Sequence, residues 1–373
     1  MHLIFVIISI ILIYVLQKNL YHRYWKKGLS TQIRFDREYM ECGEEAELGL
    51  TIVNDKALPL PVLHFKFSVD RALRFKDMEN SVVTDYYHRN DAFSVLSYQK
   101  IKRSLAFTGS ERGFFRVESV NVTVRDFFLS ATFAETRRED QGIYVFPRKV
   151  DPGRLTELMR GRVGELPARR SLIEDPLSFR GLRDYQPGDP RRSINMKQSA
   201  RTGKWKVNLY EVTLDARVRI LINLDTNSMI RADVLLEQTL SLASSIARHF
   251  LSKKERVSIW SNGMGENGQP LNLPGEGAEM SHAVTIDKYL AEIMTSTGKD
   301  AFLEQLRAER SKVSNAVLYL VISPYYKEDL LTETDQLLKE GGGVFFVVPY
   351  YRQVGMTASR PYLTGWEVDD YAE

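Results

Sequence analysis

The chain opens with an apolar segment that is almost uninterrupted. Residues 3–16 read LIFVIISIILIYVL, with Ser9 as the only polar position. A membrane-spanning helix needs about 20 residues. The long side chain of Lys18 can extend its charged end to the membrane surface, so the spanning segment can cover residues 3–20. A cleaved secretory signal would carry basic residues before the apolar run and small residues after it, and this sequence has neither. The pattern therefore predicts an uncleaved membrane anchor.

Basic residues follow this segment and none precedes it: Lys18, Arg23, Lys26 and Lys27. By the positive-inside rule, this asymmetry keeps the large C-terminal part of the chain in the cytoplasm. The single cysteine, Cys42, is compatible with a reducing compartment. We expect a single-pass protein of the cell (inner) membrane; the alternative is that the basic residues only solubilise a helix end.

Alternating apolar and polar positions characterise the next region. Residues 46–54, 62–69 and 119–125 alternate with period two and are separated by turn signals. Strand-sized runs of this kind predict an antiparallel β-sandwich over residues 28–148. The region shows no catalytic constellation, and its most prominent turn residues are Arg112-Gly113 and Asp126-Phe127-Phe128.

From about residue 216 the pattern changes to strands that alternate with helices. Strands are expected at 218–224, 256–261, 316–322 and, as the last one, 343–348. Helices are expected around 236–250, 283–293, 299–310 and 326–340. This alternation predicts a mostly parallel, doubly wound sheet over residues 216–373. Ligand sites in such sheets form at the carboxyl ends of strands, which makes Asp225 and Ser323 candidates.

Composition narrows the classes of function. The net charge is 51 − 48 = +3, too balanced for a surface built to bind nucleic acid. Hydrophobic residues make up 43% of the chain, which excludes a disordered protein. One cysteine cannot form a disulfide framework or a thiolate cluster, and no two of the six histidines lie within five residues of each other.

Enzyme signatures are missing from the sequence. Residues 263–268 match G-x-G-x-x-G, but QPLNLP follows where a dinucleotide loop must open a helix. Asn267-Gly268 is instead a signal for a tight turn. The sequence contains neither a P-loop nor a G-x-S-x-G elbow. We therefore expect no cofactor and no enzyme activity.

The most distinctive segment is residues 179–211, which reads as a turn, a short helix, a loop and a strand. Asp189 suits an N-cap with Pro190 at the first helical position, so a helix is expected over 191–199. Residues 160–206 carry 12 Lys and Arg against 5 Asp and Glu, a local charge of 12 − 5 = +7.

Two interpretations of this basic segment remain open. The guanidinium groups of Arg183, Arg192 and Arg201 could clamp a carboxylate-rich partner. Alternatively, they pin the segment to its own domain through nearby acidic residues, namely Asp184, Asp189 and Glu211.

The segment resembles the domain-of-unknown-function family 58, whose pattern is F-x-G-x-R-x-Y-x-x-G-D-x-x-R-x-I-x-W-x-x-[ST]-A-R. The matching residues are Phe179, Gly181, Arg183, Tyr185, Gly188, Asp189, Arg192, Ile194, Ser199, Ala200 and Arg201. Met196 stands where the family usually has Trp. The resemblance extends to the N-terminal anchor, to the turns at Arg112-Gly113 and Asp126-Phe127, to Val145-Phe146-Pro147 and to the C-terminal α/β region.

The resemblance implies a fold and a partner. It implies an N-terminal anchor and basic flank (1–27), a β-sandwich (28–148), a linker with the signature segment (149–215) and a von Willebrand factor A-like doubly wound sheet (216–373). Family members are typically linked with MoxR-type AAA+ ATPases in systems that assist the maturation of other proteins.

The same resemblance raises the question of a metal. Von Willebrand A domains often hold Mg²⁺ through D-x-S-x-S after the first strand, with a distant Thr and Asp. This sequence reads Asp225-Thr226-Asn227-Ser228-Met229, in which Asp225 and Asn227 keep oxygen atoms but Met229 cannot serve a hard ion. Ser323-Pro324-Tyr325 stands where the distant carboxylate is expected. We therefore expect no working metal site, with Asp225 and Asn227 as its degenerate remains.

The sequence leads to one main hypothesis and two alternatives. The main one is a non-catalytic, membrane-anchored cytoplasmic adaptor that binds client proteins together with a MoxR-type ATPase. The first alternative is a Mg²⁺-dependent ligand-binding A domain, and the second is an unrecognised hydrolase or transferase.

Overall fold

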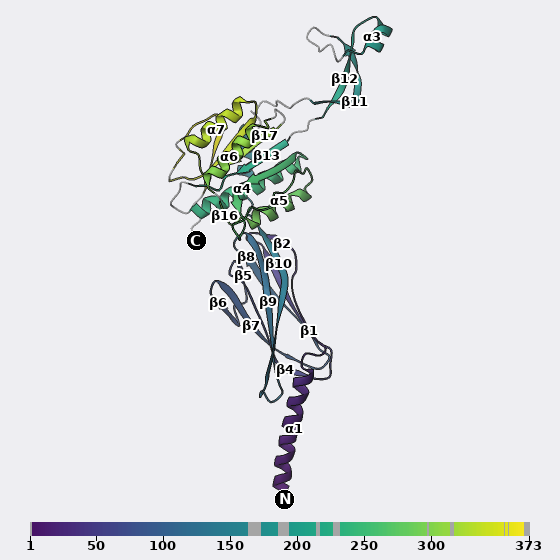
Figure 1. The fold of residues 1–373 in the computed structure, drawn as a ribbon, viewed down its shortest axis with the longest axis vertical. Helices are drawn as coiled ribbons and strands as arrows, with labels where there is room; N and C mark the ends of the chain where they lie inside the picture. Colours follow the sequence, from purple (N-terminus) through teal and green to yellow (C-terminus); the bar gives the residue numbers. More distant parts are fainter. Residues whose placement is uncertain are drawn as a thin grey trace. The chain divides into compact units, whose positions relative to one another are not determined.

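The computed structural model describes residues 2–162, 173–185, 194–213, 217–226, 232–296, 298–313, 317–353, 355–356 and 358–368. The chain divides into two compact units (Figure 1). The first contains Met1–Arg148 and Leu290–Glu292, and the second contains Lys149–Tyr289 and Ile293–Glu373.

The first unit begins with the apolar helix α1 (His2–Tyr24). Its segment Leu3–Tyr24 is long and apolar enough to cross a membrane. The apolar side chains of residues 3–16 are exposed, as expected of a surface that would face lipid rather than a protein core.

Two sheets follow α1 and pack face to face. One has the order β1 (Leu29–Phe35), β3 (Glu45–Asn54), β8 (Lys100–Gly109), β5 (Leu73–Phe75). The other has the order β2 (Tyr39–Glu41), β10 (Thr132–Phe146), β9 (Gly113–Arg125), β4 (Leu60–Asp70), β7 (Tyr86–Val95), β6 (Ser81–Val83). Neighbouring strands are antiparallel except for the parallel pair β2 and β10. The predicted β-sandwich is confirmed.

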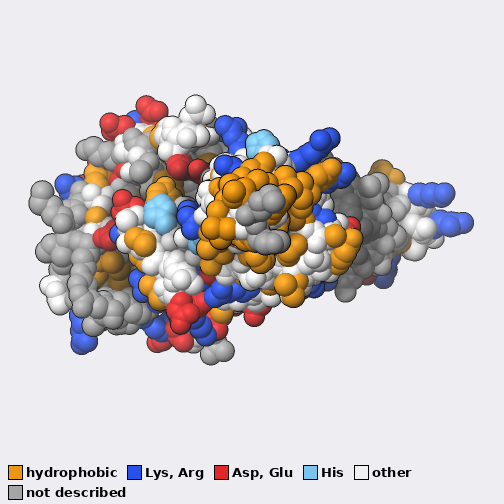
Figure 2. Space-filling model, turned by 90° about the horizontal axis from the view of Figure 1, so that it is seen from below, with side chains coloured by type: hydrophobic (Ala, Val, Ile, Leu, Met, Phe, Trp, Pro, Cys, Tyr) orange, Lys and Arg blue, Asp and Glu red, His pale blue; other side chains and the backbone are white. Residues whose placement is uncertain are grey.

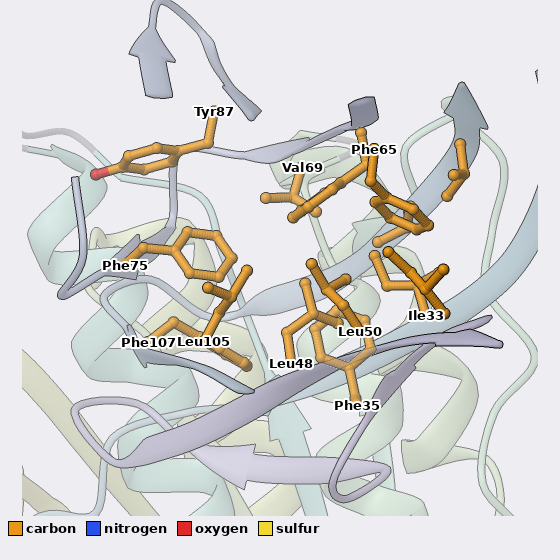
Figure 3. Packing of buried hydrophobic residues seen from close by; sticks show 14 of the residues in the cluster. Ile33, Phe35, Leu48, Leu50, Phe65, Val69, Phe75, Tyr87, Leu105 and Phe107 are labelled. Atoms are coloured by element: carbon orange, nitrogen blue, oxygen red, sulfur yellow. The ribbon is translucent and has the colours of Figure 1, made fainter. Parts of the chain in front are cut away.

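The sandwich core follows from the period-two pattern of its strands. In β3, for example, Ala46, Leu48, Leu50 and Ile52 point inward. Figure 3 shows side chains of β1, β3, β5 and β8 meeting those of β4 and β7. Phe107 packs edge-on against Phe35, with ring centroids 5.7 Å apart. Full burial of each such side chain stabilises the folded state by roughly 1.5–3 kcal/mol.

A charged network lies within this otherwise apolar unit. The side chains of Arg89 and Asp91 are both fully buried, and Arg89 Nη2 lies 3.2 Å from Asp91 Oδ1. Arg89 also donates to the Asp77 carbonyl at 2.6 Å and lies over the Phe75 ring. Arg103 closes the network by pairing with Asp91 at 3.2 Å and with Asp77 at 3.1 Å.

The second unit is built on a parallel five-stranded sheet. Its order is β14 (Arg256–Ser261), β13 (Arg217–Ile222), β17 (Val317–Ile322), β18 (Gly343–Tyr351), β19 (Leu363–Val368). The helices that accompany it are α4 (Ala232–Ser252), α5 (Ser281–Glu292), α6 (Lys299–Arg310) and α7 (Glu328–Lys339). The predicted mixed α/β character is confirmed.

Alternate residues of the central strands face different layers. Tyr319 and Val321 of β17 belong to a core with residues of α6 and α7, such as Phe302 and Leu331. The intervening Leu320 is equally buried but lies outside that core, so it faces the opposite side of the sheet. Figure 1 shows α6 and α7 on one side of the sheet and α4 on the other.

One expectation about this unit is wrong, and one of its helices was not expected. The strand expected at 343–348 is not the last, because β19 pairs with β18 in parallel at the sheet edge. The segment expected to be a linker contains helix α2 (Pro152–Arg162), which buries Leu155, Leu158 and Met159. Arg154 of α2 lies 4.5 Å from the centroid of the Trp366 ring in β19, so α2 packs on the added strand.

The remaining elements are small. β15 (Gly263–Met264) pairs with β16 (Thr295–Ser296), and the glycine-rich segment after β15 is a turn in which Gly268 has φ +66°. β11 (Ile173–Asp184) and β12 (Lys206–Thr213) form an antiparallel ribbon, with helix α3 (Met196–Thr202) between them in sequence.

Removing one partner of the buried ion network should lower the free energy of unfolding of the sandwich. In Asp91→Ala, Arg89 keeps its charge in a buried site, and we expect a loss of about 3–5 kcal/mol in the free energy of unfolding. Cys42, the only cysteine, lies in this unit and is partly buried. Pulsed thiol labelling of the full chain in detergent across a urea series therefore reports the unfolding of this unit alone.

Asp85→Ala, at an exposed position, is the matched control and should change the unfolding free energy by less than about 0.5 kcal/mol. Equal urea midpoints for the two variants would contradict the structural role of Asp91.

Candidate functional site

The carboxyl edge of the parallel sheet is the first candidate site. Ile222 and Ile322 are register partners at the ends of the neighbouring strands β13 and β17. Asp225 and Ser323, which come after these strands, are therefore brought to the same edge. Because β14 and β17 flank β13 on opposite sides, the strand order reverses here, and this is the position at which such sheets bind ligands.

Two buried asparagines fix the backbone that leads to Asp225. Asn262 donates to Asn223 Oδ1 at 3.0 Å and accepts from the Leu224 backbone N–H at 2.9 Å. Asn223 Oδ1 also accepts from the Asp225 N–H at 3.1 Å. These bonds satisfy polar groups that water does not reach, so the path of the chain up to Asp225 is specified.

The Ser323 side chain stabilises the turn in which it lies. Its hydroxyl donates to the Tyr325 carbonyl at 2.6 Å and accepts from the Tyr325 N–H at 3.0 Å, and the residue is buried. The structure therefore places Ser323 at the predicted edge but directs its side chain to the backbone.

Carboxylates gather around the neighbouring Tyr325. Its hydroxyl donates to Asp329 Oδ2 at 2.6 Å. Burial raises the pKa of the Tyr325 hydroxyl, the bond to Asp329 raises it further, and the charges of Asp225 and Asp300 add to the effect. Three acidic residues from separate elements thus act on one hydroxyl group.

The sequence analysis missed Asp300 and Asp329. Both lie in the first turn of a helix, in α6 and α7 respectively, where a negative charge complements the helix dipole. Acidic residues at the start of helices in the α/β region were the available signal. Among the described residues no group of three His, Cys, Asp or Glu side chains is arranged to hold a metal ion.

A cavity of about 870 Å³ opens at the same edge, beside the ends of β17 and β18. Its lining combines the apolar Leu331 and Tyr351 with the charged Lys327, Asp329 and Arg360. Arg360 is held in place by Glu328 at 2.9 Å and by Asp335 at 3.4 Å. The cavity offers mixed apolar and charged surface without an obvious catalytic pair.

The described part of the signature segment lies on the β11–β12 ribbon and α3. Phe179, Gly181 and Arg183 lie on β11, with Tyr185 directly after it and Arg201 exposed on α3. Gly188, Asp189 and Arg192, like Asn227 of the degenerate metal motif, lie outside the described residues.

Asp184 pairs with Lys206 at 2.6 Å across the ribbon, and this hydrogen bond lowers the pKa of the Asp184 carboxyl. The Tyr185 N–H continues the pairing by donating to the Trp205 carbonyl at 2.9 Å. Arg183, one of the expected arginines, donates through Nη1 to the Asp184 carbonyl at 3.1 Å.

The helix expected over 191–199 is displaced toward the C-terminus. Ile194 forms a bridge with Val207, so the chain is extended there. Asn195 is the N-cap and accepts from the Gln198 N–H at 3.0 Å, while Gly203, with φ +68°, ends the helix. Ser199 ties α3 to the ribbon, because its hydroxyl accepts from the Lys206 N–H at 2.8 Å.

One serine–histidine contact bears on the hydrolase alternative. Ser68 Oγ lies 2.7 Å from His88 Nδ1 across β4 and β7, beside a cavity of about 580 Å³ in the first unit. The other ring nitrogen of His88 lies 3.4 Å from the Thr84 hydroxyl. A catalytic triad needs a carboxylate or a similar acceptor to orient the histidine, and here a hydroxyl occupies that position.

No protein-family model and no curated protein matches the chain. Solved structures resemble about a third of it. A CARDB domain from Pyrococcus furiosus shares 11% identity over 32% of this chain and 90% of its own, with a TM-score of 0.21. A cohesin module from a Clostridium perfringens family 33 glycoside hydrolase shares 8% identity over 31% and 96%, with a TM-score of 0.22. Similarities this remote carry no argument about function.

The asparagine pair should control the stability of the candidate edge. Asn262→Ala leaves the Leu224 N–H buried without its acceptor, at a cost of about 1–3 kcal/mol. We expect amide exchange in peptides covering β13 and residues 223–226 to become roughly 10- to 100-fold faster, measured by mass spectrometry. Asn272→Ala, at an exposed position, should leave this exchange unchanged. Unaltered exchange in Asn262→Ala would show that the pair does not hold the edge.

Proposed function

We propose that the protein is a non-catalytic, membrane-anchored cytoplasmic adaptor that binds client proteins in concert with a MoxR-type AAA+ ATPase. The observation that carries the proposal is the signature segment, whose described residues lie on the β11–β12 ribbon and α3. α1 supplies the anchor, and the parallel sheet supplies a von Willebrand A-like domain with a ligand edge at Asp225.

The charge of the ribbon supports binding to an acidic surface. Residues 182–185 and 194–207 contain one acidic residue, Asp184, and five basic ones: Arg183, Lys197, Arg201, Lys204 and Lys206. Arg201 is exposed, and the nearby Trp205 is 56% exposed. Arginine and tryptophan are the residues that most often dominate binding energy at protein interfaces.

Binding to the ATPase is the direct test. The full chain in detergent, with α1 retained, is immobilised and titrated with the MoxR-type ATPase of its source organism. We expect saturable binding that Arg201→Ala weakens at least about tenfold, the loss of a charge-assisted contact. Arg352→Ala, an exposed arginine on another part of the same unit, is the control and should bind as the unmodified chain does.

Two outcomes count against the adaptor. One is the absence of binding by the unmodified chain. The other is an equal effect of Arg201→Ala and Arg352→Ala, which would indicate non-specific electrostatic attraction.

A Mg²⁺-dependent ligand-binding domain is the second candidate. Its support is the position of Asp225 after the first strand, within electrostatic range of Tyr325 together with Asp300. The candidate requires Mg²⁺ to stabilise the folded state, by about 2.7 kcal/mol when the metal is present at a hundred times its dissociation constant.

A thermal melt with and without millimolar Mg²⁺ separates the two candidates. The adaptor proposal expects no shift in Tm for the full chain. A rise in Tm that disappears in Asp225→Ala but persists in the exposed control Asp233→Ala would favour the metal-binding candidate instead.

A further inference from the structure

The end of α1 is built into the sandwich. Tyr21 is only 2% exposed, belongs to the sandwich core, and donates through its hydroxyl to the Pro59 carbonyl at 2.7 Å. One turn later, Trp25 stacks on Phe133 with ring centroids 6.0 Å apart, and its carbonyl accepts from Lys56 Nζ at 2.6 Å. The helix therefore cannot tilt freely relative to the sandwich.

The loop that joins β9 to β10 extends farther along the helix. In this loop, residues 126–131, Asp126 accepts from Gln17 Nε2 at 2.9 Å, and the Phe128 ring lies 6.1 Å from that of Tyr14. Tyr14 precedes the last residue of α1 by ten positions, or about 15 Å along the axis. The loop thus reaches well into the length of the apolar helix.

Asp126 gives this loop a defined shape. The residue is fully buried, and its Oδ1 accepts from the N–H groups of Ser130 at 2.6 Å and Ala131 at 2.9 Å. Its Oδ2 accepts from the Ser130 hydroxyl at 2.7 Å in addition to Gln17. Leu129 adopts a left-handed conformation with φ +58°, and its N–H donates to the Asp126 carbonyl at 3.0 Å.

The three residues at the tip of the loop are large, apolar and exposed. Phe127, Phe128 and Leu129 are 62%, 50% and 51% exposed. Figure 2 looks at this end of the molecule from below and shows hydrophobic side chains gathered around α1. A contiguous apolar surface of this kind marks an interaction site in a folded protein.

The length of α1 decides what covers this surface. The segment of α1 that is apolar enough to span a membrane is Leu3–Tyr24, about 33 Å of helix, and it includes Tyr14 and Gln17, which the loop contacts. The hydrocarbon core of a bilayer is about 30 Å thick. If α1 spans it, Gln17 and the loop beside it must lie at or below the membrane interface.

The polar groups at this depth fit that position. A buried carboxylate away from water needs all its partners within the protein, and Asp126 has four, one of them from the helix itself. At the same end, Tyr98 is 71% exposed and its N–H donates to the Lys56 carbonyl. Tyrosine at such a position is typical of the headgroup region.

We propose that residues 126–131 form a second membrane-contacting element, in which Phe127, Phe128 and Leu129 insert into the leaflet from which the sandwich emerges. The loop holds the sandwich at one depth and one rotation about α1. The proposal rests on the membrane anchorage of α1 but not on any partner of the second unit.

Depth-dependent fluorescence quenching tests this insertion. Each protein is the full chain with Cys42→Ser and one new cysteine that carries an environment-sensitive dye. Phe128→Cys and Phe127→Cys, in separate proteins, place the dye in the loop. Ile8→Cys marks the middle of α1, and Met78→Cys is an exposed apolar control elsewhere in the sandwich. Each protein is reconstituted in phosphatidylcholine–phosphatidylglycerol vesicles that contain lipids with a nitroxide at a shallow or a deep acyl position.

We expect the loop dyes to be quenched several-fold more strongly by shallow nitroxide lipids than the dye at position 78, which aqueous iodide should quench instead. The dye at position 8 should respond to deep nitroxides. Loop dyes that behave like position 78 while position 8 is quenched overturn the proposal and leave the anchor intact.

Loop dyes protected from both iodide and nitroxide lipids also overturn the proposal, in favour of a protein contact. A dye at position 8 that deep nitroxides do not quench rejects the spanning helix and the loop insertion together. None of these outcomes depends on binding of the ATPase.

Discussion

Tyr21 belongs to two environments that have opposite requirements. It lies on a helix whose residues 3–16 are almost entirely apolar, yet its ring is buried in the core of the sandwich. A helix in lipid can tilt and rotate to suit its length, whereas a side chain in a packed core cannot move without opening a cavity. The orientation of the sandwich relative to α1 is therefore constrained by the packing of this ring, and the hydrogen bond from Gln17 to Asp126 adds a second constraint.

The elements with strong periodicity could be predicted from the sequence. The strand at Arg256–Ser261 and the helix at Lys299–Arg310 have the expected bounds, since each combines a clear pattern with clear ends. β19 escaped prediction because Thr364, Gly365 and Glu367 interrupt its apolar positions, and the strand exists through its pairing with β18. α3 was displaced because Asp189 and Asn195 are both good caps by residue type, and only the bridge from Ile194 to Val207 distinguishes them.

The candidate site shows the same division between local and non-local information. Asp225 could be selected because the rule for parallel sheets needs only the strand and the residues directly after it. Asp300 and Asp329 could not, since their closeness to Tyr325 depends on how α6 and α7 lie beside the sheet. Ser323 lies at the predicted edge, but its side chain does not face a ligand. Its buried hydroxyl accepts a hydrogen bond from the nearby Tyr325 N–H instead. The position along a strand indicates which edge a residue reaches, and the hydrogen bonds decide what its side chain can do there.

The parallel pairing of β2 with β10 has a consequence for the order of events during synthesis. Tyr39 lies beside Tyr144, so this pairing in the sandwich can form only after more than a hundred further residues have been added. At about 5–20 residues per second, α1 waits on the order of ten seconds between its own completion and that of β10. Throughout that interval one of the two sheets lacks β10, which holds β2 and β9 together in the strand order β2-β10-β9-β4-β7-β6. The strand β2 can therefore join its sheet only at the end, although it is among the first strands of the sandwich to be synthesised.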